Sequence, residues 1–406
     1  MLVPGVRSLV AQEAEDRPPA KPPFDLGNAV GLPFKVATFP ISVVFNGIFF
    51  VIETLTLPGP PNFFTRTVRS LENAGIHPAV GSIGTRSGVA VTFNFVELDP
   101  FFVETGISVK GSQRHRAGIR FGDPTTSGVE LAGKFQRDAQ LTFWGIGGDT
   151  PEEDRSLYRQ ETTSADLGVW TRLGPVFVRG GVGFESNRLD SAFGTDDDEQ
   201  LTAVFEGRLP FGTEDRAKYV REDLGATLDF TQRSGFQTRG VQLSGGVTFF
   251  QGIEGTETDF HRVTGEIHTY LPLNPRQTLA LRGFAEANRI DEGTEIEFYQ
   301  RARVGSINGL RAYSPNRFTN NDGFGAQAEW RYEVWRDLYE RIRAEFFVFY
   351  EVGGVAERLS DISDAEVHDS WGFGMRMATL DNLVGYMYLG LGGEDTRFRI
   401  GNQITF

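Results

Sequence analysis

Residues 397–406 read RFRIGNQITF, and this stretch decides the fold. In an extended strand, successive side chains point to opposite faces. The apolar residues that share one face here are Phe398, Ile400, Ile404 and Phe406. A row of apolar side chains on an exposed edge strand invites aggregation in a soluble protein. The alternation therefore predicts a lipid-facing strand, and an ordinary edge strand is the alternative.

The same period of two recurs from about Arg86 to the end of the chain, in segments of roughly ten residues separated by Gly, Asp and Asn turns. The segments that show it are 88–95, 101–109, 128–135, 165–171, 176–184, 224–230, 241–249, 263–271, 278–285, 325–332, 344–350, 371–377, 385–391 and 398–406. They are too many strands for one soluble sandwich. Aromatic residues recur near their ends, as in the girdles of membrane barrels.

Arithmetic indicates the size of such a barrel. About 320 residues follow Arg86, and a tilted membrane strand with its share of turn takes about 20 residues. The ratio is about 16, an even number as bacterial barrels have. We therefore predict an all-β fold, a 16-stranded antiparallel transmembrane β-barrel over residues 76–406, with a short N-terminal helix before it. The mean hydropathy of −0.26 is compatible with this fold, because membrane strands alternate lipid-facing and lumen-facing residues.

Composition argues against several other classes of protein. The chain has no Cys, which excludes disulfides, thiolate metal sites and Cys nucleophiles. Its formal net charge of −14 argues against a nucleic-acid partner, because nucleic-acid binders carry basic faces. The five His form no H-E-x-x-H motif, and residues 80–84 (VGSIG) lack the first Gly of a nucleophile elbow. We predict no enzyme activity, no cofactor and no metal; a barrel phospholipase is the alternative.

Residues 1–75 lack the strand pattern. Residues 1–30 include the run RPPAKPP and are predicted to be flexible, and their start has the mild apolarity of a signal-peptide tail. Residues 31–75 contain the uncharged stretch 36–52, whose 17 residues fall short of the ~20 that span a bilayer. We predict a helix that plugs the barrel; a buried or interfacial helix, a membrane anchor and a contact for a partner protein are alternatives. The apolar residues singled out for the plug are Val36, Phe39, Val43 and Phe50.

Several blocks, in order along the chain, resemble the BamA/TamA superfamily of bacterial surface antigen barrels. They are FWGIGGD at 143–149 with Asp154, Arg155 and Tyr158 after it, LDFTQR at 228–233 with Gly240, GLRAY at 309–313, FFVFYEVGGV at 346–355 and WGFGMR at 371–376. The resemblance implies a protein of the bacterial outer membrane, in contact with outer-membrane lipid. During biogenesis its partner would be the outer-membrane assembly machinery, which would recognise the terminal strand.

One block is similar to the hallmark of a loop that folds back into the lumen in that superfamily. Its residues are Gly309, Leu310, Arg311, Ala312 and Tyr313, followed by Arg317 and Phe318. The resemblance implies that Arg311 pairs with two carboxylates on the inner wall, at positions matched by Glu329 and Glu351. Arg forms bidentate bonds to carboxylates that Lys does not reproduce. Two residues depart from the pattern: Ala312 replaces a Gly that a positive φ would favour, and Glu351 replaces an Asp.

Most members of that superfamily carry POTRA repeats before the barrel. Residues 1–75 show no such unit, so we expect the short type of member, without POTRA repeats. Three roles remain open. The favoured one is assembly or insertion of protein or lipid in the outer membrane; the others are a plugged or gated pore, and a structural anchor for a periplasmic protein partner.

Overall fold

The chain divides at Ser70, and the unit described below is Leu71–Phe406. The computed structural model describes residues 76–84, 86–95, 100–214, 216–234, 237–291, 293–306, 309–337, 342–379, 383–394 and 396–401. The predictions for residues 1–30, for the plug residues Val36, Phe39, Val43 and Phe50, and for Ile404 and Phe406 lie outside these ranges.

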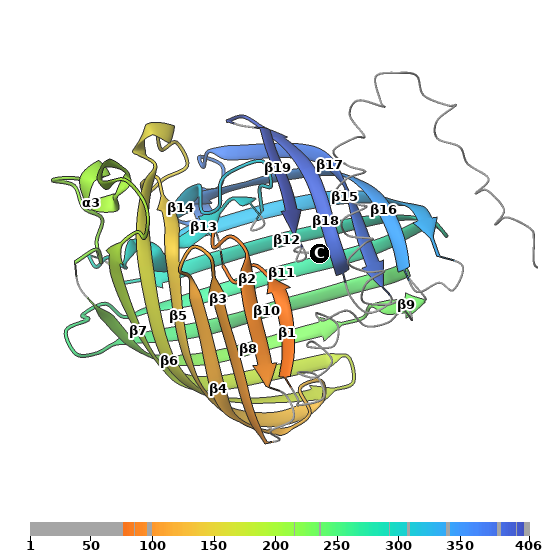
Figure 1. Cartoon of the computed structure of the whole chain (residues 1–406), viewed down its shortest axis with the longest axis horizontal. Helices are drawn as coiled ribbons and strands as arrows, with labels where there is room; N and C mark the ends of the chain where they lie inside the picture. The colour runs from red at the N-terminus through yellow and green to blue at the C-terminus, as the bar shows by residue number, and fades with distance from the viewer. Residues whose placement is uncertain are drawn as a thin grey trace, which may run out of the picture. The chain divides into compact units, whose positions relative to one another are not determined.

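The described unit consists mostly of strands (Figure 1). They are β1 (Ile76–Gly81), β2 (Ala90–Phe95), β3 (Phe101–Ser108), β4 (Gln113–Gly122), β5 (Ser127–Phe143), β6 (Ser156–Leu173), β7 (Val176–Ser191), β8 (Ala217–Asp229), β9 (Gln232–Ser234), β10 (Gln237–Gly252), β11 (Phe260–Asn274), β12 (Gln277–Ile290), β13 (Ala302–Val304), β14 (Phe318–Asn320), β15 (Asp322–Arg336), β16 (Ile342–Ala356), β17 (Val367–Thr379), β18 (Leu383–Gly392) and β19 (Thr396–Gly401). The helical pieces are η1 (Glu152–Asp154), η2 (Asp197–Glu199), α3 (Leu201–Val204), η3 (Phe298–Gln300) and η5 (Leu359–Asp361).

The strands form one antiparallel sheet in which each strand pairs with its neighbours in the chain. The large sheet has 17 strand segments. Two of these, β8 and β9, pair with the same strand β10, so that they count as one interrupted strand and the sheet has 16. The short hairpin β13–β14 stands apart from it. Among the described residues no register joins β1 to β19. The predicted fold class, a 16-stranded antiparallel membrane barrel, is confirmed.

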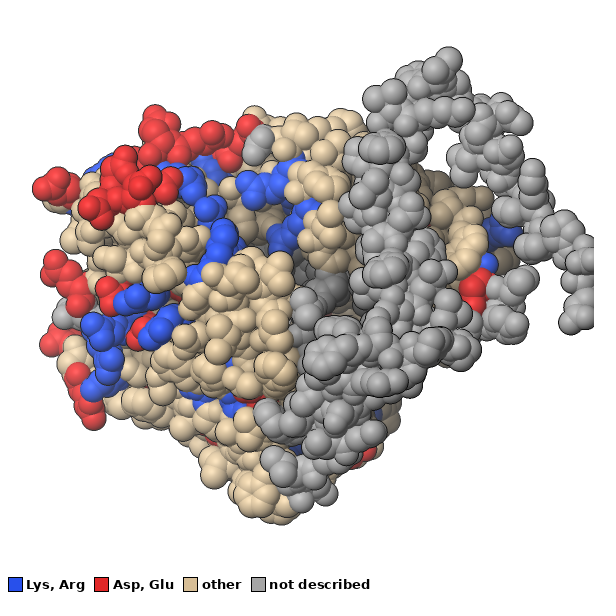
Figure 2. Space-filling model, in the orientation of Figure 1, with Lys and Arg blue, Asp and Glu red and all other residues tan. Residues whose placement is uncertain are grey.

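The two ends of the sheet differ in the length of their connections. At one end the turns are short, with Gly174 and Pro175 alone between β6 and β7. At the other end lie the long connections, of which the longest, residues 291–321, contains β13 and β14. Acidic side chains gather at this end, beside α3 (Figures 1 and 2).

The period of two separates a lipid-facing surface from a lumen. On β6 and β7, exposed apolar side chains such as Leu167 and Val182 lie on the outer face. The polar residues between them lie on the inner face, among them Asp166 and Glu185, which both bind Arg221 of β8. Because each face has its own polarity, a slip of one residue would reverse every side chain, and the alternation therefore specifies the register.

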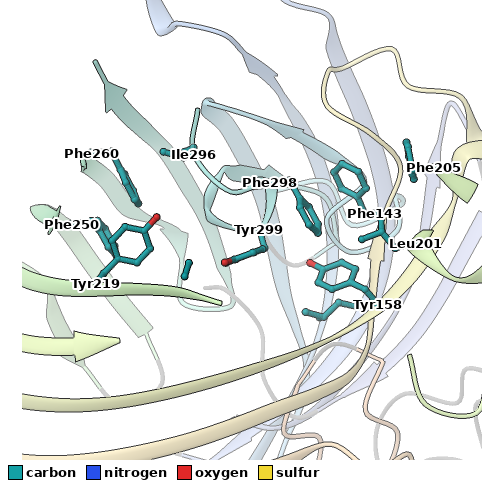
Figure 3. Packing of buried hydrophobic residues seen from close by; sticks show 12 residues of the cluster. Phe143, Tyr158, Leu201, Phe205, Tyr219, Phe250, Phe260, Ile296, Phe298 and Tyr299 are labelled. Atoms are coloured by element: carbon teal, nitrogen blue, oxygen red, sulfur yellow. The ribbon is translucent and has the colours of Figure 1, made fainter. Parts of the chain in front are cut away.

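The long connection crosses the lumen at the long-loop end and builds the largest buried apolar cluster (Figure 3). Phe298 packs 4.6 Å from Phe143 and 5.2 Å from Tyr158, measured between ring centroids. On the other side of the cluster, Phe250 and Phe260 stack at 4.3 Å. Since these rings come from β5, β6, β10 and β11, the connection binds strands on widely separated parts of the wall.

Of the 16 strands of the large sheet, the alternation missed two, and it also missed the short segments β9, β13 and β14. Every predicted segment lies wholly or partly within an observed strand, but β1 and β4 were not predicted. The inner face of β4 carries Arg114, Arg116 and Arg120, and this density of charge is typical of a loop. Two of these charges bind Glu130 of β5, a pairing that single-strand periodicity does not show. Within the described residues, no helix is long and apolar enough to cross a bilayer.

Glycine at position 372 of β17 is predicted to be essential for packing of the inner wall. A Cβ there would collide with the Leu389 carbonyl oxygen and the Phe349 ring, whereas a Cβ at Gly168 of β6 meets nothing within 4 Å. We expect Gly372→Val to lower the free energy of unfolding by about 1–3 kcal/mol and Gly168→Val to leave it nearly unchanged. Urea titration in detergent, followed by heat-modifiable gel mobility, measures both. Equal effects of the two substitutions would contradict this packing.

Candidate functional site

The candidate site is the connection between β12 and β15, which folds into the lumen. Its η3 segment accepts a hydrogen bond at the Gln300 carbonyl oxygen from Arg262 of β11. Arg303 of β13 donates to the Tyr158 hydroxyl of β6 at 3.3 Å. Farther along, the Gly309 carbonyl oxygen accepts from Gln327 of β15 at 3.2 Å. Because its partners lie on opposite parts of the sheet, the connection is enclosed by it; we call residues 291–321 the inward loop.

Arg311 lies at the tip of the inward loop and binds both predicted carboxylates. Its Nη1 lies 2.7 Å from Glu329 Oε2 on β15, and its Nε lies 2.6 Å from Glu351 Oε1 on β16. The backbone N–H of Arg311 also donates to Glu351 Oε2 at 2.6 Å. The exposed fraction is 2% for Arg311 and 0% for both glutamates. The structure therefore brings together the three residues that the sequence resemblance singled out.

A second layer of side chains fixes the two carboxylates. Ser370 of β17 donates to Glu351 at 2.8 Å and Gln327 donates to it at 2.6 Å. Arg331 donates to Glu329 at 2.8 Å. These residues were not predicted from the sequence, because a single Ser, Gln or Arg on a strand belongs to no motif that would mark it as a partner of a buried carboxylate.

Aromatic rings complete the environment of the guanidinium. Its carbon atom lies 3.7 Å from the centroid of the Phe349 ring and 5.8 Å from those of Phe347 and Tyr388. A cation over an aromatic face is attracted by the ring quadrupole. Burial opposes the charge of Arg311, but the carboxylates of Glu351 and Glu329 outweigh it and raise the pKa of Arg311 above its ordinary value.

The two departures from the family pattern are accommodated. In this part of the loop, φ is positive at Gly305 (139°), Ser306 (53°), Gly309 (137°) and Asn316 (56°) and not at Ala312. Ala312 therefore carries no backbone strain of that kind. Its backbone packs against β18 at Gly390, where an added Cβ would lie 3.2 Å from the Ala312 Cα. Glu351 reaches Arg311 with the same charge as the Asp it replaces.

The second half of the loop docks on the FWGIGGD block. Arg317 is 3% exposed; it donates to Thr150 Oγ1 at 2.7 Å and to Glu394 Oε2 at 2.9 Å. Phe318 stacks on His368 with 3.8 Å between the ring centroids. The Gly147 N–H donates to the Thr319 carbonyl oxygen at 2.8 Å. The block and the loop motif, which are far apart in the sequence, therefore form one packed unit.

The last two strands also hold the inward loop, which the sequence did not indicate. Arg397 of β19 donates to Ser314 Oγ at 2.7 Å, and Arg399 donates to Ser306 Oγ. Both arginines are on the inner face of β19, whereas Phe398 and Ile400 on the outer face are 59% and 48% exposed. The expected alternation of the terminal strand is therefore present in its described part.

A cavity of about 480 Å³ lies in the lumen beside the loop. Its charged lining consists of Arg179, Glu266, Arg282, Glu286 and Arg303. Over the described residues, no group of three or more His, Asp or Glu side chains is placed to hold a metal ion.

Removal of the Arg311 guanidinium is predicted to free the inward loop. Arg311→Ala leaves Glu351 buried without its counter-charge, and loss of one partner of a buried pair costs about 3–5 kcal/mol. We expect a lower temperature for the heat-modifiable gel shift and faster proteolysis within residues 291–321. Arg311→Lys restores the charge without the fork of donors, so it is expected to fall between the wild type and Arg311→Ala.

Arg179→Ala is the matched control, because Arg179 also faces the lumen but has no ion pair among the described residues. We expect it to change the free energy of unfolding by less than about 0.5 kcal/mol. If Arg311→Ala and Arg179→Ala were equally stable and equally resistant to protease, the loop would not depend on this pairing.

Comparison with known proteins places this architecture in a family. A profile of the Omp85 superfamily domain matches residues 101–379. The fold is similar to that of BamA from Haemophilus ducreyi lacking POTRA domains 1-3, with a TM-score of 0.55, 13% identity, and coverage of 83% of this chain and 76% of that one. It is also similar to CdiB from Escherichia coli, with a TM-score of 0.52, 14% identity, and coverage of 80% of this chain and 60% of that one. The chain belongs to the Omp85 superfamily and is a β-barrel protein of the bacterial outer membrane.

Proposed function

We propose that this barrel acts, without enzymatic activity, in the assembly or insertion of protein or lipid in the outer membrane, with the client as its transient partner. One observation carries the proposal: the inward loop binds both the β15–β16 wall and the last two strands. Through Arg311 it holds Glu329 and Glu351. Through Ser306 and Ser314 it holds β19.

This arrangement makes the position of the last strands depend on the loop. Among the described residues, the register joins β19 to β18, and the edge of a strand can act as a template for pairing with another chain. Hydrogen bonds from a charged donor contribute roughly 1.5–3 kcal/mol each. The bonds from Arg397 and Arg399 are therefore strong enough to bias the terminal hairpin and weak enough to be exchanged for contacts with a client.

The cavity beside the loop supports a gated pore as the second candidate. Its volume of about 480 Å³ exceeds the ~30 Å³ that one water takes in the liquid by more than tenfold. Its lining carries both signs of charge, as expected of a hydrated lumen. Conduction through it would require the inward loop to move.

A reversible cross-link between the loop and β18 tests the assembly role. A Cβ built at Gly392 lies 2.9 Å from the Ala312 Cβ, so a displacement of about 1 Å reaches the ~3.8 Å of a disulfide. The chain contains no other Cys. We expect vesicles holding reduced A312C/G392C protein to speed the folding of a urea-denatured barrel protein several-fold over empty vesicles, and oxidation to abolish the gain.

The reduced form of the same protein is the matched control, and oxidised A312C alone controls for the oxidant. Folding at the same rate in oxidised and reduced vesicles would contradict control by the loop, and no gain in either would contradict the assembly role. Current across planar bilayers, recorded for the full chain and for a chain without residues 1–75, tests the pore. If the A312C/G392C protein conducts when reduced, stops conducting when oxidised, and does not speed client folding, the gated pore replaces the assembly role as the proposed function.

A further inference from the structure

A row of charged side chains crosses the outer face of β5, β6 and β7. Its members are Arg137, Arg159, Glu161, Arg188 and Asp190. Opposite charges alternate along it. Arg137 Nε lies 2.8 Å from Glu161 Oε1, and Arg159 forms an ion pair with Asp190. We call these five residues the outer charge row.

The outer charge row faces away from the lumen. On β6 its residues share the face of Leu167 and Val169, which are 45% and 52% exposed. The opposite face carries Tyr158, which contacts Arg303 of the inward loop. The register pairs Arg137 with Glu161, and Glu161 with Arg188, so the row runs from strand to strand across one continuous surface.

Below the row, towards the short turns, the outer face is uncharged. On β6 these residues are Thr163, Ala165, Leu167, Val169, Thr171 and Leu173, and on β7 they are Ser186, Phe184, Val182, Gly180, Val178 and Val176. From Thr163 to Leu173 the strand rises about 2.5 Å per residue along the membrane normal when tilted by about 40°. The uncharged stretch is therefore about 25 Å tall, the height of the apolar band of an outer-membrane barrel.

The outer charge row thus lies at the rim of the apolar band, on the side of the long connections. In outer-membrane barrels the long loops are extracellular and the short turns periplasmic. The row is accordingly at the level of the outer-leaflet head groups. A charge at the middle of the band would be costly, but at this height it meets polar lipid groups.

The chemistry of the row favours a phosphorylated head group. Three arginines face two carboxylates, which leaves one excess positive charge, whereas the nearby extracellular residues 151–154 and 195–199 are acidic. The Arg188 side chain is 55% exposed, and its contact with Asp190 is 3.9 Å long, so its donors are available to an anion. A guanidinium fork matches phosphate oxygens bidentately.

We propose that the outer charge row binds the phosphorylated head group of an outer-leaflet glycolipid. The inference rests on the membrane position of the strands and is independent of the assembly role. An arginine near an anionic membrane surface strengthens binding roughly fivefold. Loss of two arginines from the row should therefore weaken head-group binding at least tenfold.

Native mass spectrometry of the full chain in detergent tests the row, with diphosphorylated lipid A as the probe and phosphatidylethanolamine as the reference lipid. We expect the wild type to prefer lipid A and R137Q/R188Q to lose at least tenfold in affinity. R188Q alone should lose severalfold, and its exposed position leaves folding intact. R179Q is the matched control, because it removes the same charge from the inner face of β7, and it should bind as the wild type does.

Heat-modifiable mobility identifies folded samples, so that a loss of binding is not confused with misfolding. No preference of the wild type for lipid A, or equal losses in R188Q and R179Q, would overturn the proposal. Complete competition by millimolar inorganic phosphate would also overturn it, because the site would then recognise a free anion and not a lipid. We expect lipid A binding by the wild type to be unchanged when inorganic phosphate is added, and the affinity for lipid A to fall in R188Q.

Discussion

One buried guanidinium, that of Arg311, determines where the inward loop lies. It is 2% exposed and binds carboxylates on two adjacent strands. A buried ion pair is weak evidence for stability, since an apolar replacement of the same shape is often as stable. Its value here is specificity: only one loop position satisfies Glu329 and Glu351 together, and any other leaves at least one buried charge uncompensated. The remaining contacts of the loop follow from that position.

The inner wall is shaped to receive the loop. Gly372 and Gly374 of β17 leave space for the rings of Phe349 and Phe347, and Gly390 of β18 leaves space for the backbone at Ala312. Glycine is unfavourable inside a strand, and it often marks close approach of another backbone. The pattern of small and large residues on β16 to β18 is thus explained by what lies within the lumen and not by strand pairing alone.

Side chains pack one part of the lumen tightly and leave a cavity in another part. An aromatic cluster closes the extracellular end between β5, β6, β10 and β11, and the ionic tip of the loop lies on the wall formed by β15 and β16. Between them a cavity of about 480 Å³ remains against β7 to β12. A loop that contacts the terminal strands on one side and borders a hydrated cavity on the other is placed to couple movement of those strands to the contents of the lumen.

The sequence alone determined the fold class, the approximate strand number and the hallmark residues of the loop. It did so because a strand with lipid on one face and a polar lumen on the other must alternate, and each strand carries that signal locally. The pairing of Arg311 with Glu329 and Glu351 was accessible only through a family resemblance. Tertiary structure alone decided which strands the loop binds, that β4 is a strand despite its charge, and that Arg397 and Arg399 reach Ser314 and Ser306. These are contacts between residues distant in the chain, and local periodicity contains no information about which distant side chain will neutralise a charge or accept a hydrogen bond.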